Sequence, residues 1–210
     1  MSDVQRTRWS LVAFPLAGIV SALSAIYMYP YDYPYMRYLI YGNVLGSGVF
    51  GVLLAAACWL SFGLRSLWKT AGFIVASVGA AYLGLFSAVA SKGKLFLPGP
   101  PYEQYDPVFF VGGFLGALAL VVAALFLLSP RPRIRSVVLT GLLSSLAGGI
   151  LGIVGAGSGD LFDRLRSRLG FMHFQVPYSD VSLIILVWQT GMSLVLALAL
   201  WSERRRSQTG

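Results

Sequence analysis

Residues 107–128 read PVFFVGGFLGALALVVAALFLL, a run of 22 residues without Asp, Glu, Lys, Arg or His. Because an α-helix rises about 1.5 Å per residue, such a run can cross a hydrocarbon core about 30 Å thick. Five more charge-free runs of similar length occur, at about 9–29, 38–62, 70–90, 136–156 and 181–202. The sequence therefore predicts an all-α, polytopic integral membrane protein with six transmembrane helices in a single domain, 1–210.

The composition of the whole chain agrees with this prediction. Of its 210 residues, 57% are hydrophobic and only 11% are charged, and the mean hydropathy is +0.73. The first run is long and ends in IYMYPYDY instead of a small-residue cleavage site, so we expect a mature helix and not a signal peptide. The single cysteine, Cys58, excludes an intramolecular disulfide or a cysteine metal site and is expected to be a small buried core residue.

The charged residues outside the runs predict an orientation. With six spans both termini share one side, and ten of the 16 Lys and Arg residues fall on that side, whereas six of the eight Asp and Glu residues fall on the other. The positive-inside rule then places both termini in the cytoplasm, in a bacterial-type inner membrane. The basic inner surface favours anionic lipid headgroups, so the pI near 9.9 does not require nucleic-acid binding.

The third outer connection contains an amphipathic segment. Residues 157–171 read GSGDLFDRLRSRLGF, where leucines recur on one helical face and arginines flank them. We expect a short helix at about 159–170 that lies flat on the outer leaflet. A helix that docks a partner protein is the alternative.

Two pairs of helices resemble each other weakly. A shift of 70 residues aligns eight identical residues between 42–84 and 112–154 without a gap. This pattern indicates either a parallel repeat that relates helices 2–3 to helices 4–5 or chance matches in a chain rich in Gly, Leu and Ala. Glycines are frequent in the second, fourth and fifth runs, which predicts close helix packing, because lipid offers apolar surface as good as another helix does.

The apolar runs contain no titratable side chain of the kinds that ion-coupled transporters use. Most hydroxyl groups there are expected to bond to carbonyls of their own helix. Four polar residues remain as candidates for interhelical hydrogen bonds or for a weakly polar path: Asn43, Ser47, Gln189 and Thr190. No paired carboxylates, lysine nucleophile or phosphate loop is present, so we predict no catalytic residues and no metal site.

His173, the only histidine, lies among aromatic residues in FMHFQVPY. We expect an interfacial imidazole that bonds to water or backbone. The alternatives are an axial ligand to a haem or chlorophyll-type pigment and a proton-responsive contact, and the sequence does not identify a cofactor.

The first outer loop contains YMYPYDYPYMRY at 27–38, with tyrosine at every second position from Tyr27 to Tyr35. Because prolines disfavour a helix, an extended chain would place these rings on one face. The rings form either an aromatic belt at headgroup level or a rigid contact platform for a protein, sugar or cation. The candidate contact residues are Tyr29, Tyr31, Tyr33, Tyr35, Tyr102 and Tyr105.

Together these features predict a non-enzymatic structural or accessory subunit of a membrane complex. It would associate with other membrane proteins, or with itself, through small-residue helix faces and aromatic outer loops. The alternative is a small transporter or channel for a neutral solute.

Overall fold

The computed structural model describes residues 3–27, 35–62, 66–92, 105–128, 134–169 and 179–209, and side-chain packing for the central part of each segment. Every described residue except Ser66 is helical. The six helices are α1 (Asp3–Tyr27), α2 (Tyr35–Phe62), α3 (Leu67–Lys92), α4 (Tyr105–Leu128), α5 (Ile134–Leu169) and α6 (Ser179–Thr209). The prediction of six helices in an all-α chain is confirmed.

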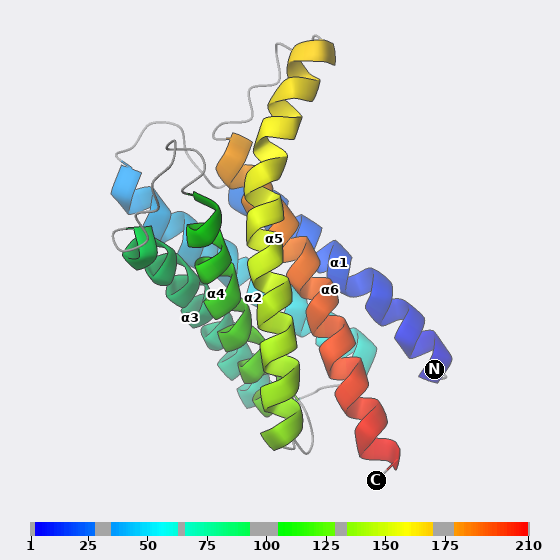
Figure 1. The fold of residues 1–210 in the computed structure, drawn as a ribbon. Helices are drawn as coiled ribbons and strands as arrows, with labels where there is room; N and C mark the ends of the chain where they lie inside the picture. The colour runs from blue at the N-terminus through cyan, green and yellow to red at the C-terminus, as the bar shows by residue number, and fades with distance from the viewer. Residues whose placement is uncertain are drawn as a thin grey trace.

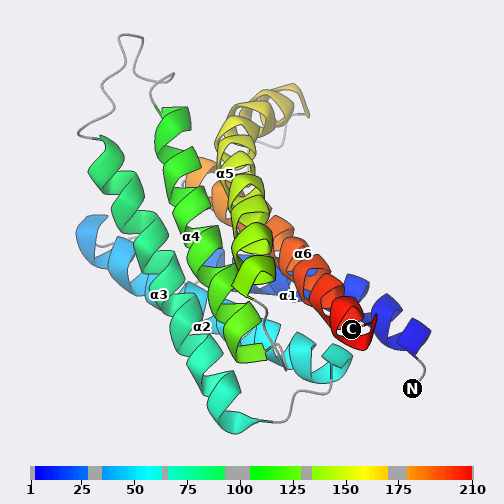
Figure 2. The same cartoon turned by 60° about the horizontal axis from the view of Figure 1, so that its bottom comes forward.

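The helices run alternately up and down and form a closed bundle (Figures 1 and 2). Each helix packs against the next one in the chain, and α6 returns to pack against α1, while α4 also contacts α6. The start of α1 and the end of α6 lie at the same end of the bundle, as six alternating helices require (Figure 1). We call this the terminal end and the opposite one the far end.

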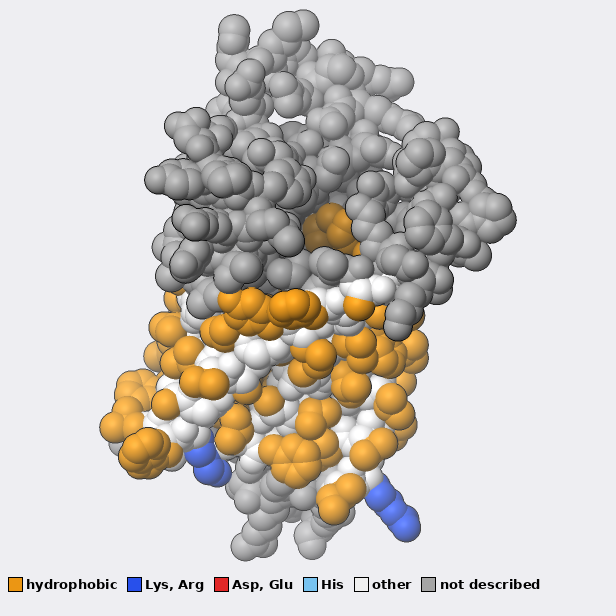
Figure 3. Space-filling view, turned by 90° about the vertical axis from the view of Figure 1, so that its left-hand side faces the viewer, with side chains coloured by type: hydrophobic (Ala, Val, Ile, Leu, Met, Phe, Trp, Pro, Cys, Tyr) orange, Lys and Arg blue, Asp and Glu red, His pale blue; other side chains and the backbone are white. Residues whose placement is uncertain are grey.

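Four helices contain apolar segments long enough to cross a membrane: Leu67–Ala88, Val108–Leu128, Ile134–Gly155 and Ile184–Arg205. In α1 and α2 the corresponding segments with described side chains are shorter, Trp9–Ala25 and Gly46–Phe62. On the side of the bundle where α3 lies, apolar side chains cover the described surface, and Lys and Arg side chains lie below them (Figure 3). The structure thus contains several helices suited to a hydrocarbon environment.

One predicted element is wrong in its boundaries. Residues 159–169 are not a separate helix, because α5 continues without a break for 36 residues and its last turns project beyond the neighbouring helices (Figure 1). The segment contains one glycine, Gly159, and no proline. A glycine in a helix costs only about 1 kcal/mol relative to alanine and keeps its backbone N–H, so it need not end the helix.

Glycines set the distance between several pairs of helices. A Cβ atom added to Gly148 of α5 would lie 2.6 Å from the Gly113 carbonyl oxygen of α4, and one added to Gly84 of α3 would lie 2.9 Å from the Gly112 carbonyl oxygen of α4. Similarly, a Cβ at Gly18 of α1 would lie 2.8 Å from the Thr190 Cα of α6. These approaches confirm that small residues permit close helix packing.

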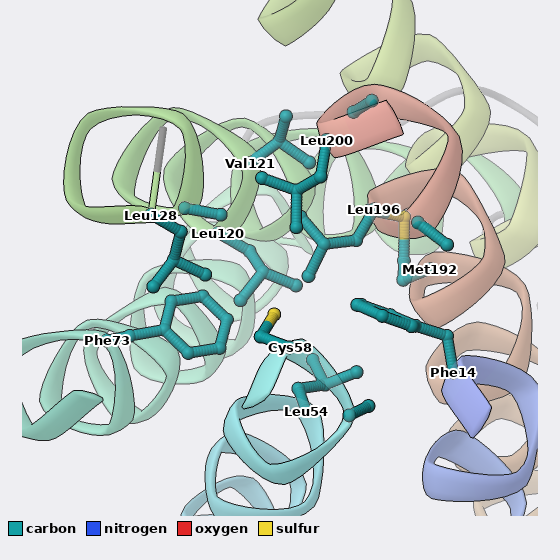
Figure 4. Close-up of a cluster of buried hydrophobic side chains, with 14 of the residues drawn as sticks. Phe14, Leu54, Cys58, Phe73, Leu120, Val121, Leu128, Met192, Leu196 and Leu200 are labelled. Atoms are coloured by element: carbon teal, nitrogen blue, oxygen red, sulfur yellow. The ribbon is translucent and has the colours of Figure 1, made fainter. Parts of the chain in front are cut away.

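The middle of the bundle contains a cluster of apolar side chains, and the serines buried at a similar height, Ser77, Ser145 and Ser193, bond to carbonyls of their own helices. Fully buried side chains from five helices meet there, among them Phe14, Leu54, Cys58, Phe73, Leu120 and Leu196 (Figure 4). Cys58 is buried with a free thiol, as the sequence predicted. We call this cluster the apolar layer.

Candidate functional site: two polar layers in the core

The core-facing stripe of α6 is polar at both ends and apolar between them. Its residues recur at intervals of three and four and are all buried: Gln189, Met192, Leu196, Leu200 and Glu203. This spacing places them on one face of a helix. Gln189 and Glu203 are 14 positions apart, which corresponds to about 21 Å along the helix axis.

The stripes of α2 and α1 follow the same pattern. In α2 the buried residues at this spacing include Ser47, Phe50, Leu54, Cys58 and Ser61, and in α1 they include Ser10, Phe14, Ala17 and Ser21. The two helices are aligned by a hydrogen bond of 3.3 Å that the Ser21 hydroxyl donates to the Gly46 carbonyl.

Two polar layers therefore flank the apolar layer. The far polar layer consists of Ser21, Ser47 and Gln189, and the terminal polar layer consists of Ser10, Ser61 and Glu203. If the apolar layer lies at the middle of the bilayer, each polar layer lies about 10 Å from the midplane, inside a 30 Å hydrocarbon core.

At the far polar layer, one turn of α6 has three buried polar atoms without hydrogen-bond partners. These are Trp188 Nε1, Gln189 Oε1 and Thr190 Oγ1. Gln189 is only 8% exposed. A buried polar atom without a partner is uncommon in native proteins, and each such atom calls for an explanation.

This turn of α6 is held by three other helices. The Gln189 carbonyl lies 2.7 Å from where a Gly18 Cβ would be, so α1 packs directly against it. The indole of Trp188 packs against α2, with 6.4 Å between its ring centroid and that of Phe50. The same indole contacts α4 at Gly116, where an added Cβ would lie 3.5 Å from Trp188 Cζ2.

At the terminal polar layer, Glu203 is a buried carboxylate that is 4% exposed. The Ser136 hydroxyl of α5 donates a hydrogen bond to its Oε2 atom. The neighbouring Arg204 donates to the Phe62 carbonyl at 3.5 Å and lies over the Phe62 ring, so the ends of α2 and α6 are joined. Arg205 lies 4.0 Å from the centroid of the Trp201 ring.

Sequence reasoning missed Glu203 as a core residue. It lies one position beyond the charge-free run 181–202 and next to three arginines, so it was counted with the charged tail. The signal that could have identified it is the spacing of three and four residues from Gln189, which continues through Leu200 to Glu203.

Among the predicted polar residues, the structure brings Ser47 and Gln189 into the same layer and places Thr190 beside them. Asn43 lies within α2, but its side chain lies outside the described part. Several other hydroxyls bond to carbonyls of their own helix, as predicted, including Ser77 to Phe73 at 2.8 Å and Thr70 to Ser66 at 3.0 Å.

The predicted tyrosine ridge is wrong at its two ends, because Tyr27 closes α1 and Tyr35 begins α2. Tyr105 likewise begins α4. The remaining candidate contacts and the candidate ligand lie outside the described residues: Tyr29, Tyr31, Tyr33, Tyr102 and His173. Among the side chains that are described, no group of three His, Cys, Asp or Glu residues could hold a metal ion.

None of the protein-family models, curated proteins or solved structures compared with this chain matches it.

Proposed function

We propose that the chain is an integral membrane protein without enzymatic activity that serves as a structural or accessory subunit of a membrane complex. The apolar layer supports this proposal over a continuous passage. It is made of fully buried side chains from five helices, and the buried hydroxyls of Ser77, Ser145 and Ser193 bond to carbonyls of their own helices. Water and polar solutes are excluded from such closely packed apolar side chains.

The observation that carries the proposal is the exposed face of α3. Only 18% of its apolar segment is buried inside the protein, against 44% for α4 and 39% for both α5 and α6. The side chains of Trp68, Val75 and Phe86 are 89%, 72% and 67% exposed, and their spacing places them on one helical face.

Gly79 lies on the same face of α3. An added Cβ there would meet no atom within 4 Å, so this glycine has no packing partner within the chain. Elsewhere in the bundle, glycines such as Gly84 and Gly148 are in close contact with a neighbouring helix. Because a small residue allows another helix to approach closely in a membrane, a free glycine amid large apolar residues favours a docking face.

The test is site-specific cross-linking in the native membrane. A photo-crosslinking phenylalanine analogue at Val75 is expected to capture another membrane protein or a second copy of this chain. The same analogue at Leu146, an exposed apolar position of α5, is the matched control and is expected to capture none. Gentle extraction, native electrophoresis and mass spectrometry of the cross-linked band would identify the partner.

A bulkier residue at Gly79 sharpens the test. Gly79→Leu is expected to abolish the cross-link from Val75 while the bundle keeps its thermal stability, because the added atoms meet open space. If the analogue at Val75 captures only lipid, and the extracted protein is a monomer without partners, the subunit proposal is wrong.

A second candidate function is passage of a neutral solute. The three unpartnered polar atoms at Trp188, Gln189 and Thr190 favour it, because a transported molecule could supply their hydrogen bonds. It requires the apolar layer to open during the cycle. Uptake of labelled neutral solutes into reconstituted vesicles, compared with Gln189→Leu, separates this candidate from the first.

A further inference from the structure

The last turns of α6 carry an outward-facing stripe that changes from apolar to basic. Its members recur at intervals of four and three, which places them on one helical face: Leu194, Leu198, Trp201 and Arg205. Leu194 and Leu198 are 38% and 46% exposed, and Arg205 is exposed as well. By the same spacing, the stripe lies on the opposite side of α6 from the buried Glu203. We call these four residues the outer stripe of α6.

An aromatic ring positions the charged end of the stripe. The Arg205 guanidinium lies 4.0 Å from the centroid of the Trp201 ring. This is the geometry of a cation–π contact, which keeps the guanidinium beside the stripe. A guanidinium presents five N–H donors in a planar fork, and that arrangement suits the oxygens of a phosphate group. The outer stripe therefore combines an apolar surface with a positioned group of the kind that binds phosphate.

The depth of Arg205 follows from the length of the helix. The apolar segment of α6, Ile184–Arg205, has 22 residues. At 1.5 Å per residue it measures about 33 Å, slightly more than a hydrocarbon core, so its last residue reaches the lipid headgroups. Exposed tryptophans mark the same end of the bundle on three other helices: Trp9 is 59% exposed, Trp59 is 49% exposed and Trp68 is 89% exposed. Tryptophan is enriched at the level where headgroups meet the hydrocarbon core.

The described surface around this end of α6 is positively charged. Arg135 of α5 is exposed and precedes Ser136, whose hydroxyl bonds to Glu203, so Arg135 lies at a similar level to Arg205. Among the side chains that the structure describes, Glu203 is the only acidic one, and its burial keeps it from the surface. The charge of the surface thus complements an anionic ligand, and basic residues at a membrane surface attract anionic lipids.

We propose that the outer stripe of α6 binds one anionic phospholipid. Its phosphate group accepts hydrogen bonds from the Arg205 guanidinium, and one acyl chain lies against Trp201 and Leu198. Arg135 adds attraction for the negative charge. This binding goes beyond the subunit role and does not depend on it, because only this chain and the bilayer are required. It can therefore be tested on the purified protein.

Trp201 itself is the reporter. Replacing the other four tryptophans, Trp9, Trp59, Trp68 and Trp188, by phenylalanine leaves Trp201 as the only indole. The protein is reconstituted into vesicles of phosphatidylcholine and phosphatidylglycerol in which one of the two lipids carries bromine atoms on its acyl chains. Bromine quenches an indole that it contacts, so the two series give the relative affinity of the stripe for the two lipids.

We expect a preference for the anionic lipid. Phosphatidylglycerol should bind about 5-fold more strongly than phosphatidylcholine, the effect of one basic residue near an anionic membrane surface. High salt should weaken the preference, because it screens charges at the surface. If the four tryptophan replacements prevent reconstitution, native mass spectrometry of the parent protein gives the same comparison, and the parent should retain phosphatidylglycerol that Arg205→Gln loses.

Three variants locate the interaction. Arg205→Gln should reduce the preference to near one, whereas Arg205→Lys keeps the charge and should restore most of it. The matched control is Lys69→Gln, which removes a positive charge from the same end of the bundle. Lys69 belongs to α3, which lies across α4 from α6 (Figure 2), so the preference measured at Trp201 should not change.

Several results would overturn the proposal. Equal affinity for the two lipids, or a preference that survives in Arg205→Gln, would show that the stripe has no site for anionic lipid. An equal loss in Lys69→Gln would show only diffuse attraction to a basic surface. Competition by water-soluble glycerol phosphate would show a site for free phosphate. An indole that neither lipid quenches would show that a second copy of the chain covers the stripe.

The two proposals can fail separately. The cross-linking experiment concerns α3 and proteins in the native membrane, whereas the quenching experiment concerns α6 and two lipids of known composition. A lack of partner proteins at Val75 would leave the lipid preference at Trp201 unaffected.

Discussion

Gln189 is the residue at which stability and function are expected to conflict. Its Oε1 atom is buried without a partner, so Gln189→Leu should raise the free energy of unfolding by about 1–2 kcal/mol in ligand-free protein. For a chain of this size, each kcal/mol of added unfolding free energy raises Tm by about 2–4 °C. Thermal unfolding of the two proteins in detergent measures this difference in Tm. A lower Tm for Gln189→Leu would mean that the amide stabilises the fold through contacts that this structure lacks.

At the other end of the same stripe, the hydrogen bond between Ser136 and Glu203 is expected to stabilise the bundle. Ser136→Ala removes a donor from a buried carboxylate and should lower the free energy of unfolding by about 1–3 kcal/mol. Ser24→Ala is the control, because the Ser24 hydroxyl bonds to the Val20 carbonyl of its own helix at 2.8 Å.

A double-mutant cycle isolates this interaction. In the Glu203→Met background both acceptor oxygens are absent, so Ser136→Ala should cost clearly less than in the parent protein. Equal losses in both backgrounds would show that Ser136 acts through packing and not through Glu203.

At the scale of the helices, the contact between α4 and α5 should be the most sensitive to added volume. Gly148→Ala places a Cβ 2.6 Å from the Gly113 carbonyl oxygen and against Ala117, so the helices must separate. Overpacking of this kind typically costs about 1–3 kcal/mol. Gly79→Ala is the matched control, and it should be neutral or slightly stabilising because the new methyl meets open space and alanine favours a helix.

Thermal unfolding of the two glycine variants gives a direct comparison. A Tm for Gly148→Ala equal to that of Gly79→Ala would mean that α4 and α5 are not as close as the structure has them. The same comparison bears on the docking face of α3, because Gly79→Leu is informative only if Gly79→Ala leaves the bundle intact.

The sequence predicted the helices well because length and lack of charge are enough to define a membrane-crossing run. It could not predict that α5 continues through 159–169, since the small cost of a glycine does not by itself end a helix. Gln189 and Ser47 were found because polar residues stand out in apolar runs. Glu203 was missed because a charge at the edge of a run gives no sign of burial, which depends on packing against α5.

At the scale of the whole molecule, the two ends of α3 test both insertion and orientation. Ser66 and Ala90 are exposed at opposite ends of this helix, and their separation of 24 positions corresponds to about 36 Å, more than the thickness of a hydrocarbon core. In a Cys58→Ala background, Ser66→Cys and Ala90→Cys each provide one reactive thiol. We expect a membrane-impermeant maleimide to label Ala90→Cys in intact cells and Ser66→Cys only after the membrane is opened.

The expected asymmetry follows from the charges. The described basic side chains Lys69, Arg135, Arg204 and Arg205 belong to the terminal end, where α3 and α5 begin and α6 ends. The positive-inside rule retains such residues in the cytoplasm. Reversed labelling would place the terminal end outside the cell. Labelling of both cysteines in intact cells would show that α3 does not cross the membrane, and the polar layers would then have to be explained as the core of a bundle outside the bilayer.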